Sequence, residues 1–186
     1  MKKTVLTFGL ISGGILSLMM LSTVPFVDQI GFDKGAIIGY TTMVLSFLLV
    51  FFGIRSYREN IGQGVITFGR AFSVGILITI ISCLLYVVTW EIVYFKLMPG
   101  FADKYVGHVI DQVRASGASP QEIDAKIQEM KKFKEMYDKP LVNAALTFIE
   151  PFPIGLVITL LSAMILRKRR KVMVGERQQV VVGSSQ

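Results

Sequence analysis

The sequence predicts an all-α integral membrane protein, a four-helix transmembrane bundle with an extracytoplasmic helical hairpin between spans 3 and 4. The 186-residue chain is 52% hydrophobic and only 18% charged, whereas roughly a quarter of the residues in a soluble domain are charged. The apolar residues gather in four segments, each long enough to cross a hydrocarbon core of about 30 Å as a helix. Basic residues gather in the segments that would share one side of the membrane. Together these features exclude a soluble globule, a disulfide-stabilised secreted domain and a wholly disordered chain.

The four spans are expected near residues 4–27, 35–54, 71–95 and 141–166, with the hairpin over 101–139. The first span follows two lysines, as in a signal peptide, but it exceeds the usual length of about 7 to 15 apolar residues and lacks a small-residue cleavage site. We therefore expect it to be retained. Residues 1–171 are expected to form a single transmembrane domain, and residues 172–186 a flexible cytoplasmic tail.

The distribution of charge predicts the orientation of the spans, because Lys and Arg resist translocation. Residues 101–140 carry seven basic and seven acidic side chains, so the net charge of +7 comes from the other polar segments. This pattern indicates a multi-pass protein of the cytoplasmic (inner) membrane with both termini in the cytoplasm. Nucleic-acid binding is not expected, since no broad basic face accompanies the charge.

A basic cluster follows the last span and is expected to stop translocation and to contact lipid headgroups. Attraction to anionic lipid contributes about 1 kcal/mol per basic residue near the surface. The cluster consists of Arg167, Lys168, Arg169, Arg170 and Lys171.

The segment between spans 3 and 4 has the pattern of two helices. Apolar residues recur every four positions from Phe101 to Val113, which predicts one apolar stripe on a helix. Ser119 stands three residues before Glu122 with Pro120 in the first helical position, as in a capping box. The resulting hairpin is interpreted either as a cap over the outer mouth of the bundle or as a binding surface for a partner.

Small residues spaced at helical intervals predict close helix packing, within the bundle or between copies of the chain. Such residues let backbones approach each other in lipid, although this spacing is also common by chance. The residues concerned are Gly9, Gly13, Ser17, Gly35, Gly39 and Gly75.

Two carboxylates inside apolar spans suggest a polar pocket in the outer leaflet. Glu91 and Glu150 both fall nearer the outer end of their spans, where an ionised group is costly unless it has a polar environment. Asn143 and Thr147 share the helical face of Glu150. A structural role stays open, in which Glu91 reaches the interface and Glu150 satisfies a broken helix or pairs with a nearby lysine.

Pro151 and Pro153 are expected to break the fourth span next to Glu150. Each lacks a backbone N–H, and Pro151 disfavours helical geometry at the residue before it. We expect no catalytic residues, no cofactor and no metal site, because His108 has only Asp111 nearby in the sequence and no ligand motif accompanies them.

Several of these segments occur together, in order, in a known family. Residues 64–72, 89–91 and 150–153, with the helical insertion between the last two, resemble an uncharacterised family of bacterial four-span membrane proteins, domain-of-unknown-function family 4199. The resemblance extends from Lys2 to about Arg170. It implies four spans and a helical segment between the last two, and it implies no catalytic roles.

The sequence favours a non-enzymatic assembly or interaction component of the membrane, with membrane lipids and either a second copy or another protein as partners. The alternative is a small-molecule or lipid-binding transport accessory that uses the outer-leaflet carboxylate pocket. A membrane enzyme is a third hypothesis, weakened by the shortage of candidate nucleophiles and bases near the two glutamates.

Overall fold

A computed structural model describes residues 1–168 of the protein, and the architecture of this part confirms the predicted all-helical fold with four candidate membrane spans. The spans are longer than expected from the apolar segments alone, because polar ends continue the helices. Each is long and apolar enough to cross a membrane, which indicates a membrane-embedded protein. They cover Lys2–Ile30, Phe32–Asn60, Phe68–Leu97 and Pro140–Leu166.

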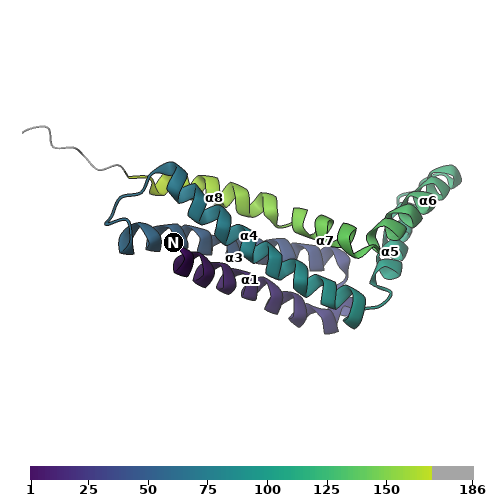
Figure 1. Ribbon diagram of the computed structural model, residues 1–186. Helices are drawn as coiled ribbons and strands as arrows, with labels where there is room; N and C mark the ends of the chain where they lie inside the picture. The colour runs from purple at the N-terminus through teal and green to yellow at the C-terminus, as the bar shows by residue number, and fades with distance from the viewer. Residues whose placement is uncertain (169–186) are drawn as a thin grey trace, which may run out of the picture.

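The four spans lie side by side, and a helical hairpin projects from one end of the bundle at a steep angle (Figure 1). We call this the hairpin end, and we call the opposite end, where Met1 and Lys168 lie, the terminal end. The helices are α1 (Lys2–Thr23), η1 (Val24–Phe26), α2 (Val27–Ile30), α3 (Phe32–Asn60), α4 (Phe68–Ile92), the π-helical η2 (Val93–Leu97), α5 (Phe101–Ala115), α6 (Pro120–Tyr137), α7 (Pro140–Ile149) and α8 (Phe152–Leu166).

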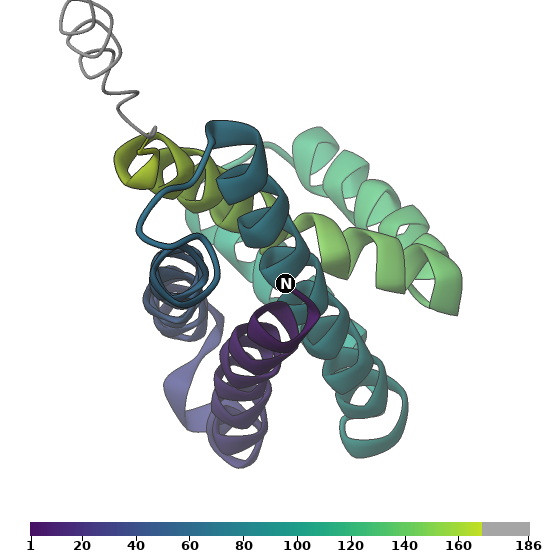
Figure 2. The same cartoon turned by 60° about the vertical axis from the view of Figure 1, so that its left-hand side comes forward.

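Helix α4 is the centre of the bundle and packs against α1, α3, α7 and α8 (Figure 2). Glycines permit the closest approaches. A Cβ atom on Gly13 would lie 2.7 Å from Leu85 of α4, and one on Gly155 of α8 would lie 2.4 Å from Thr79 of α4. Backbones this close gain dispersion contacts, which replace the hydrophobic effect as the main attraction between helices in lipid.

Buried hydroxyl groups connect the helices at these contacts. The Ser46 hydroxyl of α3 donates a 2.7 Å hydrogen bond to the Ser12 carbonyl of α1. The hydroxyls of Thr79 and Thr159, on α4 and α8, lie 3.1 Å apart. In a membrane such bonds contribute about 0.6 kcal/mol each on average, so they mainly fix the register of helices already packed by small residues.

The outer surface of the bundle is apolar, which is the reverse of a soluble protein. Leu18 is 67% exposed, Ile37 is 68% exposed and Ile165 is 70% exposed. In water such a surface favours association or aggregation, whereas lipid tails solvate it without cost. The surface therefore agrees with the membrane-embedded state indicated by the span lengths.

The terminal end is closed by a short backbone pairing. Ile66, in the loop before α4, exchanges two hydrogen bonds of 3.0 and 2.9 Å with Lys168 after α8. An Arg58 N–H donates to the Leu166 carbonyl at 3.3 Å, which satisfies one of the last carbonyls of α8. Arg167 and Lys168 are exposed here, while Arg169, Arg170, Lys171 and the tail over 172–186 lie outside the described residues.

The hairpin contains the capping box that its sequence predicts. The Glu122 amide donates to the Ser119 hydroxyl at 3.4 Å, and the Ser119 amide donates to the Glu122 carboxylate at 2.7 Å. Helices α5 and α6 pack on each other. Which side of the membrane they occupy stays a prediction from the charge distribution.

Candidate functional site

The fourth span is broken at Glu150 and Pro151, where α7 ends and α8 begins. Pro151 has no N–H to donate, so the α-helical hydrogen bonding is interrupted at this position. On the terminal side of the break, α8 packs on both α3 and α4, whereas on the hairpin side α7 packs on α4 and makes few contacts with α3. The hairpin-end half of α3 therefore lacks the helix contact that α8 makes with the other half.

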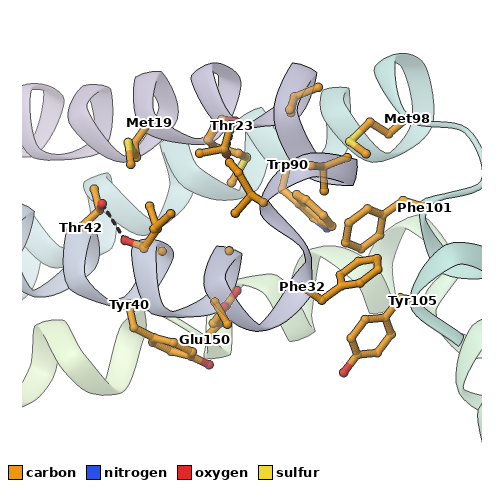
Figure 3. A pocket seen from close by; sticks show the side chains of 18 of the residues that line it. Met19, Thr23, Phe32, Tyr40, Thr42, Trp90, Met98, Phe101, Tyr105 and Glu150 are labelled. Atoms are coloured by element: carbon orange, nitrogen blue, oxygen red, sulfur yellow. Dashed lines mark hydrogen bonds between the residues drawn. The ribbon is translucent and has the colours of Figure 1, made fainter. Parts of the chain in front are cut away.

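A cavity of about 460 Å³ occupies the space that this divergence leaves. Its walls are the hairpin-end halves of α1, α3 and α4, and the first turns of α5 with the end of α6 cover it. Figure 3 shows aromatic rings from several of these elements pointing into the same space. The aromatic residues that line it are Phe32, Tyr40, Tyr86, Trp90, Phe101, Tyr105, Phe133 and Tyr137.

Glu150 is the sole charged side chain that lines this cavity within the described part of the chain. The Tyr86 hydroxyl donates a hydrogen bond of 3.1 Å to Oε2 of Glu150. None of the ion pairs found over residues 1–168 involves Glu150, so its partner here is a tyrosine and not a lysine. The site is a carboxyl group at the edge of an apolar, aromatic cavity.

Glycines form part of the α3 wall. Ideal Cβ atoms built on Gly35 and Gly39 meet no other atom within 4 Å, and both residues line the cavity. The spacing that suggested helix packing therefore leaves open space at these two positions, because α3 diverges from its neighbours there. Gly9, Gly13 and Gly75 instead lie at close contacts with side chains of a neighbouring helix.

Ser17 contributes a polar contact between helices. Its hydroxyl accepts a 2.7 Å hydrogen bond from the Thr89 hydroxyl and lies 3.5 Å from the Leu85 carbonyl of α4. This contact holds α1 against α4 near the cavity, as expected of a residue at a helix interface.

Glu91 does not line the cavity. Tyr86 and Trp90 face it one helical turn apart, and Glu91 is rotated about 100° from Trp90 around α4. Its Oε1 atom is buried and has no hydrogen-bond partner among the described residues. The two glutamates of the predicted pocket thus have separate environments, and no hydrogen bond joins them over residues 1–168.

Asn143 and Thr147 are buried behind the cavity. The Asn143 amide donates to the Tyr137 carbonyl at 3.1 Å, and the Thr147 hydroxyl donates to the Asn143 side-chain oxygen at 3.2 Å. These bonds secure the corner between α6 and α7. Neither residue lines the cavity or makes a hydrogen bond to Glu150 over residues 1–168.

Aromatic side chains hold the hairpin over the bundle. The Trp90 indole donates to the Tyr137 hydroxyl at 2.9 Å, and the Trp90 and Phe101 rings meet edge to face with centroids 5.0 Å apart. The Phe101 ring packs in turn on Phe32 of α3 at 5.6 Å. Burial raises the pKa of Tyr137 above its ordinary value, so its hydroxyl stays protonated.

Ion pairs add to this attachment at the surface. The Lys104 ammonium lies 2.7 Å from the Asp28 carboxylate, and the His108 ring lies 3.5 Å from Asp33, so α5 is tied to α2 and to the first turn of α3. Within the hairpin, the Asp103 carboxylate raises the pKa of Lys134. Exposed pairs of this kind each contribute about 0 to 1 kcal/mol, so the aromatic contacts are the stronger attachment.

Sequence reasoning identified Glu150 but not the tyrosines around it. Tyr86 and Trp90 are four residues apart in the third span and therefore share one face of the helix. This spacing is the sequence feature that could have indicated an aromatic face. Tyr40 and Tyr137 come from distant parts of the sequence, so only the fold brings them together. Over residues 1–168, no group of three or more His, Cys, Asp or Glu side chains is placed to hold a metal ion.

A comparison with protein families identifies the family of this chain. Residues 7–168 match the family described as "Protein of unknown function (DUF4199)". The chain belongs to this family. The match confirms the resemblance seen in the sequence, and it includes every residue that lines the cavity of this DUF4199 protein. No curated protein and no solved structure matches the chain.

Proposed function

We propose that this DUF4199 protein is a non-enzymatic membrane protein that binds an amphiphilic, lipid-like molecule in its cavity. The observation that carries the proposal is the cavity of about 460 Å³, apolar and aromatic, with the carboxyl group of Glu150 at its edge. Cavities of this size, with many apolar and few polar groups, are typical of small-molecule sites. The apolar walls suit a hydrocarbon chain, and the carboxyl group suits a polar head.

The position of the cavity favours entry from within the bilayer. Tyr40 is 49% exposed at its boundary, and Glu150 is also exposed there. Both lie within membrane spans, at the level where α3 and α7 diverge. A lipid-like molecule can therefore pass sideways between these two helices without crossing an aqueous layer.

Methionines suit the apolar end of such a ligand. Met19 and Met20 of α1 and Met43 of α3 line the cavity, and methionine adapts its unbranched side chain to irregular apolar shapes. A cavity lined in this way accepts chains of differing length. Specificity then depends on the polar groups near Glu150.

The charge distribution supports an outer-leaflet location for this cavity. The hairpin end is balanced in charge, while Arg55, Arg58, Arg70 and Lys168 lie towards the terminal end. Under the positive-inside rule the terminal end faces the cytoplasm. We therefore propose a cytoplasmic-membrane protein with cytoplasmic termini, whose ligand comes from the outer leaflet.

An assembly role is the second candidate. Of the glycines that suggested it, Gly9 and Gly13 pack on α4, whereas Gly35 and Gly39 border the cavity. The remaining candidate surface is the hairpin, which projects beyond the bundle (Figure 1). Its projection favours contact with a protein partner outside the membrane.

Photolabelling tests the binding proposal. The full chain in a nonionic maltoside detergent is labelled with a long-chain alcohol that carries a diazirine, and the labelled peptides are mapped.

Gly39→Leu fills the cavity, because a Cβ atom at Gly39 would meet no other atom within 4 Å. Gly14→Leu is the matched control, because Gly14 also has open space but does not line the cavity. We expect labelling of cavity peptides to fall about tenfold in Gly39→Leu and to be unchanged in Gly14→Leu. Equal labelling of all lipid-facing helices in all three proteins would overturn the proposal.

A further inference from the structure

We infer that the cavity selects a hydrophobic cation, an amphiphile whose head is an amine or a quaternary ammonium group. The inference rests on the proposed function and names the chemical class of its ligand. Two independent features of the lining support it. One is the acidic side chain of Glu150, and the other is the set of aromatic rings in the same cavity.

The lining carries one acidic side chain and, over residues 1–168, no basic side chain to pair with it. Glu150 is the single charged residue among those described that border the cavity, and no lysine, arginine or histidine of that part of the chain accompanies it. An isolated carboxylate is costly in an apolar medium and is stabilised by a paired cation. A cationic head supplies that partner, whereas an anionic head is repelled by the carboxylate.

The carboxyl group keeps acceptor capacity for a ligand. Tyr86 donates to Oε2, and within the described residues Oε1 makes no hydrogen bond. An ionised carboxylate offers about four lone-pair sites, so one tyrosine leaves most of them free. A primary or secondary ammonium can donate to these sites, and a quaternary ammonium can approach them electrostatically.

Aromatic rings line the same cavity as this carboxyl group. Tyr40, Tyr86, Trp90 and Tyr137 all line the cavity, and Figure 3 shows the Tyr40 ring beside Glu150, with Trp90 on the neighbouring wall. The faces of tyrosine and tryptophan rings attract cations by about 0.5 to 2 kcal/mol, with the larger values at desolvated sites. Aromatic rings and a carboxylate both attract a cation, so together they bind an alkylated ammonium group better than a hydroxyl or a sulfate.

Competition among three amphiphiles of equal chain length tests the inference. Dodecyltrimethylammonium, dodecanol and dodecyl sulfate are titrated against the photoreactive alcohol, with the full chain in nonionic maltoside detergent. We expect the ammonium to displace the probe from the wild-type cavity at about tenfold lower concentration than dodecanol, and the sulfate to be weaker than both. Displacement by ammonium and dodecanol at the same concentration would overturn the cation inference while leaving the cavity proposal intact.

Variants then assign the selectivity to named side chains. Glu150→Gln keeps size and hydrogen bonding but removes the charge, so the preference for ammonium is expected to vanish while labelling by the alcohol persists. Glu91→Gln is the matched control and is expected to keep the preference, because Glu91 does not line the cavity. An ammonium preference that persists in Glu150→Gln overturns the role of this carboxylate.

A second variant covers the case in which Glu150→Gln fails to fold. Tyr40 is 49% exposed, and no hydrogen bond of its hydroxyl is found over residues 1–168, so Tyr40→Leu is tolerated by the fold. We expect about threefold weaker competition by the ammonium and unchanged competition by dodecanol. Equal weakening of both overturns the aromatic part of the inference. Failure of the alcohol to label cavity peptides in the wild type is a different result and overturns the proposed function itself.

Discussion

The Tyr86 hydroxyl donates a 3.1 Å hydrogen bond to Oε2 of Glu150, and this bond joins the central helix α4 to the break between α7 and α8. Few other polar contacts are available to a carboxyl group at this depth in an apolar span. The tyrosine therefore has two effects. It satisfies one oxygen of Glu150, and it ties the side chain of Glu150 to α4 at the edge of the cavity.

Replacing Tyr86 with phenylalanine is predicted to lower the free energy of unfolding by about 1 kcal/mol. The change removes the donor while keeping the ring, so the loss is that of one hydrogen bond. The free energy of unfolding is measured in mixed detergent micelles, with circular dichroism as the signal. Tyr40→Phe is the matched control, because no hydrogen bond of the Tyr40 hydroxyl is found in the described part of the chain. An equal loss in both variants would contradict a specific role for the Tyr86 hydroxyl.

Alanine substitutions at Gly155 and Gly35, two glycines within helices, are predicted to have opposite effects on stability. A Cβ atom at Gly155 would lie 2.4 Å from Thr79, so Gly155→Ala forces α8 and α4 apart and costs about 1 to 3 kcal/mol. Gly35 has no neighbour within 4 Å, so Gly35→Ala gains about 0.5 to 1 kcal/mol from the higher helix propensity of alanine. Thermal unfolding in detergent compares the two. A stable Gly155→Ala variant would show that the close packing of α8 on α4 is not as described.

The two glutamates are predicted to respond differently to removal of their charge. One oxygen of Glu91 is buried without a partner, and leaving such a group unsatisfied costs about 1 to 3 kcal/mol. Glu91→Leu is therefore expected to raise the unfolding temperature and to leave cavity labelling unchanged. Glu150→Leu is expected to lose the preference for cationic amphiphiles. Loss of that preference in Glu91→Leu would mean that both carboxylates belong to one site.

Some of this architecture could be predicted from the sequence because it depends on local pattern. The length of an apolar segment decides whether it can span a bilayer, and Pro151 interrupts helical hydrogen bonding in any surroundings. The capping box at Ser119 and Glu122 likewise needs only residues three apart. These features were predicted and are present in the structure.

The cavity could not be predicted in the same way, because it depends on contacts between distant residues. Gly9 and Gly35 have the same residue type and the same four-residue repeat, yet Gly9 touches Ile81 of α4 and Gly35 borders open space. Nothing in the local spacing tells which helix lies opposite. For the same reason the pairing of Tyr86 with Glu150 could be found only once α4 and α7 were placed beside each other.

Acidification is predicted to loosen the start of α6. The backbone amide and hydroxyl of Ser119 donate to the Glu122 carboxylate and hold its pKa below the ordinary value. Because the folded pKa is the lower one, this contribution is complete above the unfolded pKa of about 4.3 and is lost as the pH falls through the folded pKa. Hydrogen exchange at the first amides of α6, corrected for the intrinsic pH dependence, should therefore accelerate on acidification. Glu122→Gln is the control, since a glutamine in the same place accepts the hydrogen bonds at every pH. Acceleration of equal size in that variant would assign the effect to another group.

Cysteine labelling is predicted to find the hairpin and the opposite loop on different sides of the membrane. Gln121 on α6 and Ile61 after α3 are both exposed, while the native Cys83 is buried and contributes little background. In intact cells a membrane-impermeant maleimide is expected to label Gln121→Cys and to label Ile61→Cys only after permeabilisation, because the basic residues of the terminal end resist translocation. Labelling in the reverse pattern would place the cavity in the cytoplasmic leaflet, and its ligand would then come from that leaflet. Labelling of both positions from one side would be incompatible with an odd number of membrane crossings between them, and hence with Phe68–Leu97 as a span.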